Sequence, residues 1–138
     1  MVAPPNLYLS QSLMNVEFSI LADQATFASG KLSISGIFET IAATAFPAVH
    51  GKCFVATKIR QEGESSEQHT LRIAMEDQSG KEVITSKEEP FTIEGKDAAY
   101  THTLEILNLP LTGPGSFLIK TYVDKELLKE IPLFVGKQ

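Results

Sequence analysis

From Val16 onwards, apolar and polar residues alternate with a period of two in a series of separate runs. Each alternating run predicts a half-buried β-strand, because successive side chains of a strand point to opposite faces. Such runs cover residues 16–20, 32–35, 53–60, 70–76, 82–86, 100–106, 117–123 and 127–135, with a brief segment at 91–93. Turn residues separate the runs, and no amphipathic helix interrupts them. The pattern therefore predicts an all-β protein, an antiparallel two-sheet β-sandwich of the immunoglobulin-like or C2-like type with about eight strands.

Three positions predict interruptions of these strands. Gly36 breaks the phase that begins at Leu32, which indicates a β-bulge. The run from Tyr100 is expected to stop at Leu109-Pro110. Pro132 has no backbone N–H to donate, so we expect the last strand to lie at an edge or a bulge there.

The first fourteen residues lack the alternation, and Pro4-Pro5 disfavours regular structure. We therefore expect an N-terminal arm or tail at residues 1–14 and a single β-sandwich domain at residues 15–138. Two alternatives stay open. Met14 could be an internal start, or residues 7–9 could form a short edge strand.

The net charge of the chain narrows its range of partners. The chain carries 17 acidic and 12 basic residues among 138, a formal charge of −5. A negative field repels phosphate backbones and anionic lipid headgroups, so we expect no nucleic-acid partner and no membrane partner. The acidic residues concentrate between Glu62 and Asp97, which is typical of solvated loops, with a site for a basic partner as the alternative.

Cys53 is the single cysteine, so the chain cannot form an intramolecular disulfide. Its position in the strand pattern faces the core, where a thiol is inert. The chain begins without the basic and apolar regions of a signal peptide, and no apolar run approaches the ~20 residues needed to span a bilayer. These features favour a reducing compartment, and we expect the protein to be cytoplasmic.

Residues that could carry chemistry are few and scattered. His50, His69 and His102 do not have the spacing of metal ligands, and no nucleophile elbow or phosphate-binding glycine loop is present. Four aspartates in predicted turns are candidate calcium ligands, but turns favour aspartate without any ion: Asp23, Asp77, Asp97 and Asp124. We expect no catalytic residue, no metal and no cofactor.

The segment Ile41–His50 is apolar but follows neither the strand nor the helix period. It is expected to connect two strands. One interpretation is a loop over the open end of the sandwich, with Phe46 and Val49 filling the core and Pro47 setting the turn. The other is an apolar patch that binds a partner or a second copy through Phe46, Pro47, Val49 and His50.

Several motifs together resemble a family of small bacterial proteins of unknown function. The resemblance covers about residues 15–135 and leaves the first fourteen outside it. It implies a bacterial origin and a compact β domain, and it assigns no site residues. The motifs are Val16–Asp23, Gly30–Leu32, Gly36–Phe38, Phe46–His50, Tyr122–Asp124 and Ile131–Leu133.

The leading hypothesis for function is a non-enzymatic protein-interaction or binding module. A second hypothesis is a structural or assembly component, forming a homo-oligomer or a phage-like particle in which the 1–14 arm reaches a neighbour. A third is a small-molecule carrier or enzyme with a pocket near Tyr100 and His102.

Overall fold

The computed structural model describes residues 14–63 and 65–138, and this part of the chain is all-β, as the alternation predicted. It has ten strands, where the sequence pattern indicated about eight. None of the described residues forms an apolar helix that could span a bilayer. The strands are β1 (Met14–Ala28), β2 (Lys31–Ile37), β3 (Thr40–Ala43), β4 (Ala48–Gln61), β5 (His69–Glu76), β6 (Glu82–Thr85), β7 (Glu89–Phe91), β8 (Ala99–Leu111), β9 (Gly115–Val123) and β10 (Glu126–Lys137).

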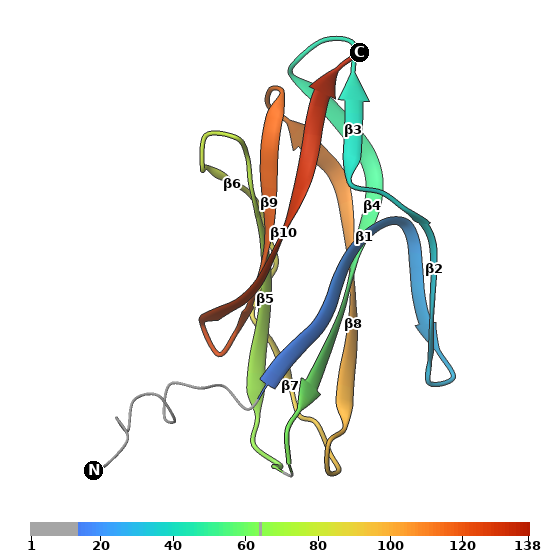
Figure 1. Ribbon diagram of the computed structural model, residues 1–138, viewed down its shortest axis with the longest axis vertical. Coiled ribbons are helices and arrows are strands. Elements are labelled where there is room, and N and C mark those ends of the chain that lie inside the picture. Colours follow the sequence, from blue (N-terminus) through green and yellow to red (C-terminus); the bar gives the residue numbers. More distant parts are fainter. Residues whose placement is uncertain (1–13, 64) are drawn as a thin grey trace, which may run out of the picture.

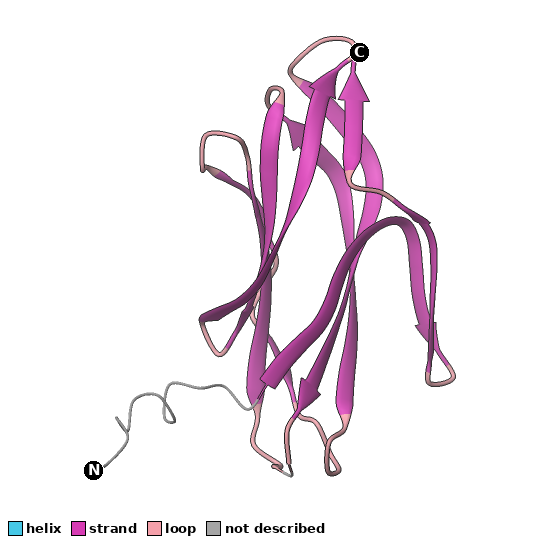
Figure 2. Cartoon of the chain, in the orientation of Figure 1, coloured by secondary structure: helices cyan, strands magenta, loops and turns pink. Residues whose placement is uncertain are grey.

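The strands form two sheets, which Figures 1 and 2 show from one side. One sheet has the order β2-β1-β4-β8. The other has the order β3-β10-β9-β5-β6, and β7 pairs with β5 beside this path. Neighbouring strands are antiparallel except β3 and β10, which are parallel. We refer to them as the four-stranded and the six-stranded sheet.

The core lies between the two sheets and takes alternate residues from each. Ile59 of β4 and Phe117 of β9 are fully buried, one on each sheet. Removing such a side chain from water contributes about 1.5–3 kcal/mol to stability, so the paired inner faces hold the sheets together. The largest buried apolar side chains are Phe117, Ile59, Leu71, Ile73, Met75, Ile93, Leu109, Ile119, Leu133, Val55 and Val123.

Strand β1 belongs to two pairings. Its first part pairs with β4 up to Ala22, and its second part pairs with β2 from Ala22 onwards. At this point the strand bends over, so that the β1–β2 hairpin projects from the body (Figure 1). Residues 38 and 39 then lead across to the other sheet, where β3 pairs with the end of β10.

The β-bulge predicted at Gly36 is absent, because the register of β1 and β2 is continuous across that residue. Gly36 has a φ of +71°, and a Cβ there would lie 2.5 Å from the Asp23 Oδ2 atom. The glycine is thus explained by its left-handed backbone and a close approach, not by an extra residue. Register shifts occur instead between Val16 and Phe18, between Leu127 and Lys129, and between Met75 and Glu76.

Pro110 and Pro132 both lie within strands, and the prediction fails for Pro110 but holds for Pro132. β8 does not stop at Leu109-Pro110 but runs on to Leu111, and Pro110 pairs with Val49 of β4. β8 is the last strand of the four-stranded sheet, where a missing N–H breaks no ladder. Pro132 of β10 pairs with β9 and precedes the residues that pair with β3. β10 is therefore an edge strand at this position, which confirms the prediction.

Met14 is the first residue that the structure describes. β1 begins at Met14, which the missing alternation had assigned to the arm, and Met14 is buried opposite Gln61. Residues 1–13 lie outside the described part of the chain, and so do the expected arm and the possible strand at residues 7–9.

Candidate functional site

The segment Ile41–His50 is not one connecting loop. Residues up to Ala43 belong to β3 and residues from Ala48 to β4, so only residues 44–47 connect the two strands. The segment shows no period because it holds the ends of two strands in different sheets, each too short to set a pattern.

The four residues predicted to bind a partner divide into two pairs. Pro47 and Val49 are exposed, and 62% of Val49 is accessible to solvent. Phe46 packs against the core, and the ring of His50 lies 5.6 Å from that of Phe38. The structure therefore places Phe46 as a core-filling residue and leaves Pro47 and Val49 on the surface.

The register of β4 against β8 explains this division. His50 lies opposite the buried Leu109, so it turns to the inner face, whereas Val49 lies opposite Pro110 and turns outward. Successive residues of a strand alternate between the faces, so Val49 and His50 cannot both contact one partner there.

Leu107 is exposed, like Pro47 and Val49, and the sequence pattern did not predict its exposure. It lies on β8 opposite Lys52 and is 57% exposed, although Ile106 beside it is buried. Asn108 has a φ of +56°, and β8 changes phase at this point. The signal in the sequence is that Leu107 directly follows an inward-facing isoleucine. We define the end patch by Pro47, Val49, Leu107 and Pro110.

Charged side chains border the end patch. Lys52 Nζ lies 3.4 Å from Glu105 Oε2, and it also lies 5.6 Å from the centre of the Phe54 ring. Both members of the ion pair are about half exposed. An apolar centre with a polar, solvated rim is the usual composition of a protein-binding surface.

Tyr100 and His102, the candidates for a small-molecule pocket, pack in a row of rings. Phe91 stacks on Tyr100 with centroids 4.6 Å apart, and His102 follows at 6.2 Å from Tyr100. Burial raises the pKa of Tyr100 with a smaller contribution from Glu89, and burial lowers the pKa of His102. Both side chains are therefore neutral at pH 7, and one face of the Tyr100 ring is covered.

The thiol of Cys53 is fully buried, as its strand phase predicted. Burial raises its pKa to about 11, and the charge of Asp23 adds to the effect. The thiolate, which is the nucleophilic form, is scarce at neutral pH.

Asp23 does not lie in a turn as predicted but within β1, whereas the other three aspartates lie outside the strands and bind backbone amides. Asp97 accepts a hydrogen bond from the Gly63 amide at 2.9 Å, and Asp124 accepts one from the Thr70 amide at 3.0 Å. Asp77 accepts two from the turn that follows it. In residues 14–63 and 65–138 no three His, Cys, Asp or Glu side chains are grouped to hold a metal ion.

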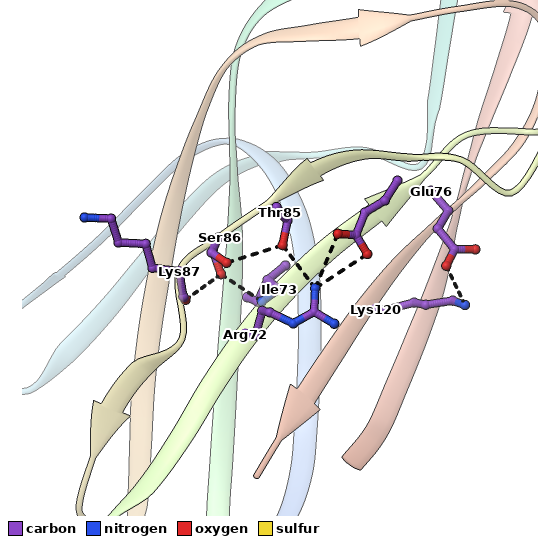
Figure 3. Close-up of polar contacts among 8 residues, drawn as sticks. Arg72, Ile73, Glu76, Thr85, Ser86, Lys87 and Lys120 are labelled. Atoms are coloured by element: carbon purple, nitrogen blue, oxygen red, sulfur yellow. Dashed lines mark hydrogen bonds and ion pairs between the residues drawn. The ribbon is translucent and has the colours of Figure 1, made fainter. Parts of the chain in front are cut away.

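The outer face of the six-stranded sheet carries a network of paired charges (Figure 3). Arg72 donates a hydrogen bond to the Thr85 hydroxyl at 3.0 Å, and its guanidinium lies 4.3 Å from the centre of the Tyr122 ring. Lys120 donates to Glu76 at 2.9 Å. These contacts join β5 to β6 and β9 and engage each charge with a neighbour.

Comparison with known protein families identifies a family that matches this chain. The model of a family of unknown function, DUF6941, matches residues 17–136 of this chain. The chain belongs to this family. This confirms the prediction that the chain belongs to an uncharacterised family. No curated protein matches the chain.

Solved structures share the fold of this DUF6941 protein at low identity. The Pseudomonas fluorescens alkylpurine DNA glycosylase AlkC, bound to DNA with an abasic site analogue, matches with a TM-score of 0.62 and 10% identity over 94% of this chain. The β-glucosidase EmGH1 of Erythrobacter marinus matches with a TM-score of 0.53 and 13% identity over 88% of this chain. This chain spans 32% of the AlkC chain and 15% of the EmGH1 chain, so the likeness concerns the fold alone.

Proposed function

We propose that this DUF6941 protein is a non-enzymatic interaction module that binds a protein partner through the end patch. The observation that carries the proposal is the exposure of Val49 and Leu107, 62% and 57%, on neighbouring strands. Covering each of these side chains contributes only part of the about 1.5–3 kcal/mol that accompanies a change from full exposure to full burial. Exposed apolar groups with a polar rim mark interaction surfaces.

The neighbouring residues set the chemistry of the partner. Lys52 and Glu105 place one charge of each sign beside the apolar centre, so the partner needs an apolar projection flanked by polar groups of either sign. The Phe46 side chain packs on the core, and it is not itself a contact residue in this proposal.

A homo-oligomer is the second candidate, supported by the position of β8. This strand is thirteen residues long and ends the four-stranded sheet, so its outer backbone groups have no strand partner in the described chain. Long free edges are surfaces on which a second chain can add a strand. Leu107 lies on this edge strand and would be covered by the same contact.

The test compares the double variant Val49→Ser, Leu107→Ser with Leu127→Ser, which removes another exposed leucine (42%) from the β9–β10 hairpin. Affinity purification with quantitative mass spectrometry and light scattering are carried out on all three proteins. We expect a partner, or a second copy, to be held by the reference protein and by Leu127→Ser and lost from the double variant. Retention by a folded double variant would contradict the proposal.

For the sandwich type, we propose the immunoglobulin-like arrangement over the C2-like one. The neighbours β8, β4 and β1 correspond in order to strands E, B and A, and β10, β9, β5 and β6 to strands G, F, C and C′. An experimental structure that showed a different strand order would contradict this proposal.

A cytoplasmic location and a bacterial origin also belong to the proposal. The free, buried thiol of Cys53 supports a reducing compartment. Fractionation of source cells, with detection of the protein by antibody, tests the location.

A further inference from the structure

A pocket of about 400 Å³ opens between the two sheets, away from the end patch. It lies beside the part of β1 that precedes its pairing with β2 and the part of β10 that precedes its pairing with β3. We call it the inter-sheet pocket. Its lining includes Ser19, Leu21, Ile37, Phe38, Glu39 and Ile131.

The wall of this pocket is held by both sheets. The Phe38 amide donates to the Leu21 carbonyl at 3.0 Å, and the Phe134 amide donates to the Glu39 carbonyl at 2.8 Å. The segment that carries Phe38 and Glu39 is therefore tied to the four-stranded sheet at one residue and to the six-stranded sheet at the next. Such a wall is present before any ligand binds.

Ser19 supplies polar groups to the inner side of the pocket. It is 7% exposed, and its hydroxyl is buried without a hydrogen-bond partner in the described structure. The Leu21 carbonyl points toward the pocket wall, and the Ser19 carbonyl, two residues earlier on the same strand, points the same way. Ser19 thus places a carbonyl oxygen on one side of the pocket, and its hydroxyl lies buried and without a described partner in the same residue.

Glu39 supplies a negative charge at the rim. Its side chain is exposed, and the described residues provide no ion pair to its carboxylate. Glu17, two residues before Ser19 on β1, is by contrast paired with Arg60 and Lys58. An unpaired carboxylate beside Ile37, Phe38 and Ile131 gives the pocket one charged and one apolar side.

We propose that the inter-sheet pocket binds a small primary amine with an apolar body, in its ammonium form. The ammonium group has three donors, which the Glu39 carboxylate and the Ser19 oxygens accept. The apolar body lies against Phe38 and Ile131. The pocket volume falls within the range of about 300–1,000 Å³ that small-molecule sites occupy. This site is separate from the end patch, so it stands or falls independently of the proposed function.

The test uses the full chain, labelled with ¹⁵N, and three probes of similar shape: 2-phenylethylamine, 2-phenylethanol and 3-phenylpropanoate. Two-dimensional NMR at pH 7 follows each titration. We expect the amine to shift the amide signals of residues 19–21 and 37–39, with an affinity about tenfold above that of the alcohol, a difference of about 1.4 kcal/mol. The carboxylate probe should bind more weakly than either.

Variants then assign the contacts. Glu39→Gln should remove the preference for the amine and leave the alcohol unaffected, because it removes the charge and keeps the size. Glu94→Gln, at an exposed carboxylate of a different groove, is the matched control and should change nothing. Ser19→Ala should weaken both the amine and the alcohol.

Four results would overturn the proposal. They are equal binding of the amine and the carboxylate probe, signal shifts elsewhere in the spectrum, an unchanged preference in Glu39→Gln, and absence of binding at about 10 mM amine. Should Ser19→Ala not fold, Glu39→Gln still decides, because its side chain is exposed and its backbone contact to Phe134 is unchanged.

Discussion

The carboxylate of Asp77 accepts a hydrogen bond from the hydroxyl of Thr112, 3.1 Å away and 35 positions later in the chain. This contact joins the turn after β5 to the turn after β8. The other carboxylate oxygen accepts bonds from the Ser79 amide, the Ser79 hydroxyl and the Lys81 amide at 2.7–3.0 Å. Chiefly the Ser79 hydrogen bond, aided by those from Lys81 and Thr112 and opposed by burial, lowers the Asp77 pKa to about 2.

The depressed pKa of Asp77 predicts a loss of stability in acid. A carboxyl whose pKa is about 2 when folded and near 3.8 when unfolded stabilises the fold above pH 3.8, and this contribution is lost as the pH falls toward 2. Urea unfolding measured between pH 6 and pH 2 should therefore show a shallower decline for Asp77→Asn than for the reference protein. Glu94→Gln, at an exposed carboxylate, serves as the control; equal slopes for Asp77→Asn and the reference would contradict the prediction.

Gly36→Ala should destabilise the protein by about 1–3 kcal/mol, because the methyl group meets Asp23 in a left-handed backbone conformation. Gly136→Ala is the matched change, since a Cβ there meets no atom within 4 Å, and its effect should stay within about 0.5 kcal/mol. Chemical unfolding of both variants measures the difference. Similar free energies of unfolding for the two would show that Asp23 moves aside freely.

Cys53 should resist thiol reagents in the native state. Its side chain is fully buried and its pKa is raised to about 11, so both access and thiolate are lacking. Reaction with an aromatic disulfide reagent at pH 8 should be complete in urea and very slow without it, while Cys53→Ala reports the background. Complete labelling of the native protein within minutes would disprove this.

Phe117 and Phe134 test the core against the surface with the same chemical change. Phe117 is fully buried on β9, and Phe134 on β10 is 48% exposed. Phe117→Ala should cost about 3–5 kcal/mol, and Phe134→Ala should cost clearly less because half of its side chain already contacts water. Thermal and chemical unfolding provide the two values. Equal losses would mean that the exposed face of β10 is covered in solution.

Much of the strand pattern was predictable because alternation is a local property. Residues 53–60 and 117–123 show the two-residue repeat several times in succession, and these segments lie within strands β4 and β9. The turn at residues 112–114 was equally predictable from its glycine and proline. Such signals depend only on neighbouring residues.

The predictions at Gly36 and Pro110 were wrong because both depend on tertiary neighbours that the local sequence does not show. A phase break at a glycine has the same sequence signature whether the chain inserts a residue or makes room for a side chain, here that of Asp23. A proline ends an inner strand but not one at the edge of a sheet, and only the strand order shows that β8 is at the edge.

The alternation of side chains determined that this protein is all-β, that Cys53 faces the core, and where most strands lie. The tertiary structure alone decided which residues become neighbours: Val49 lies opposite Pro110 in the end patch, and Ser19 and Glu39 line the same inter-sheet pocket. The physical reason is that such neighbours come from strands far apart in the chain, and their pairing depends on how two whole sheets cover one core. A local pattern predicts a strand's buried face but not the strand that lies beside it.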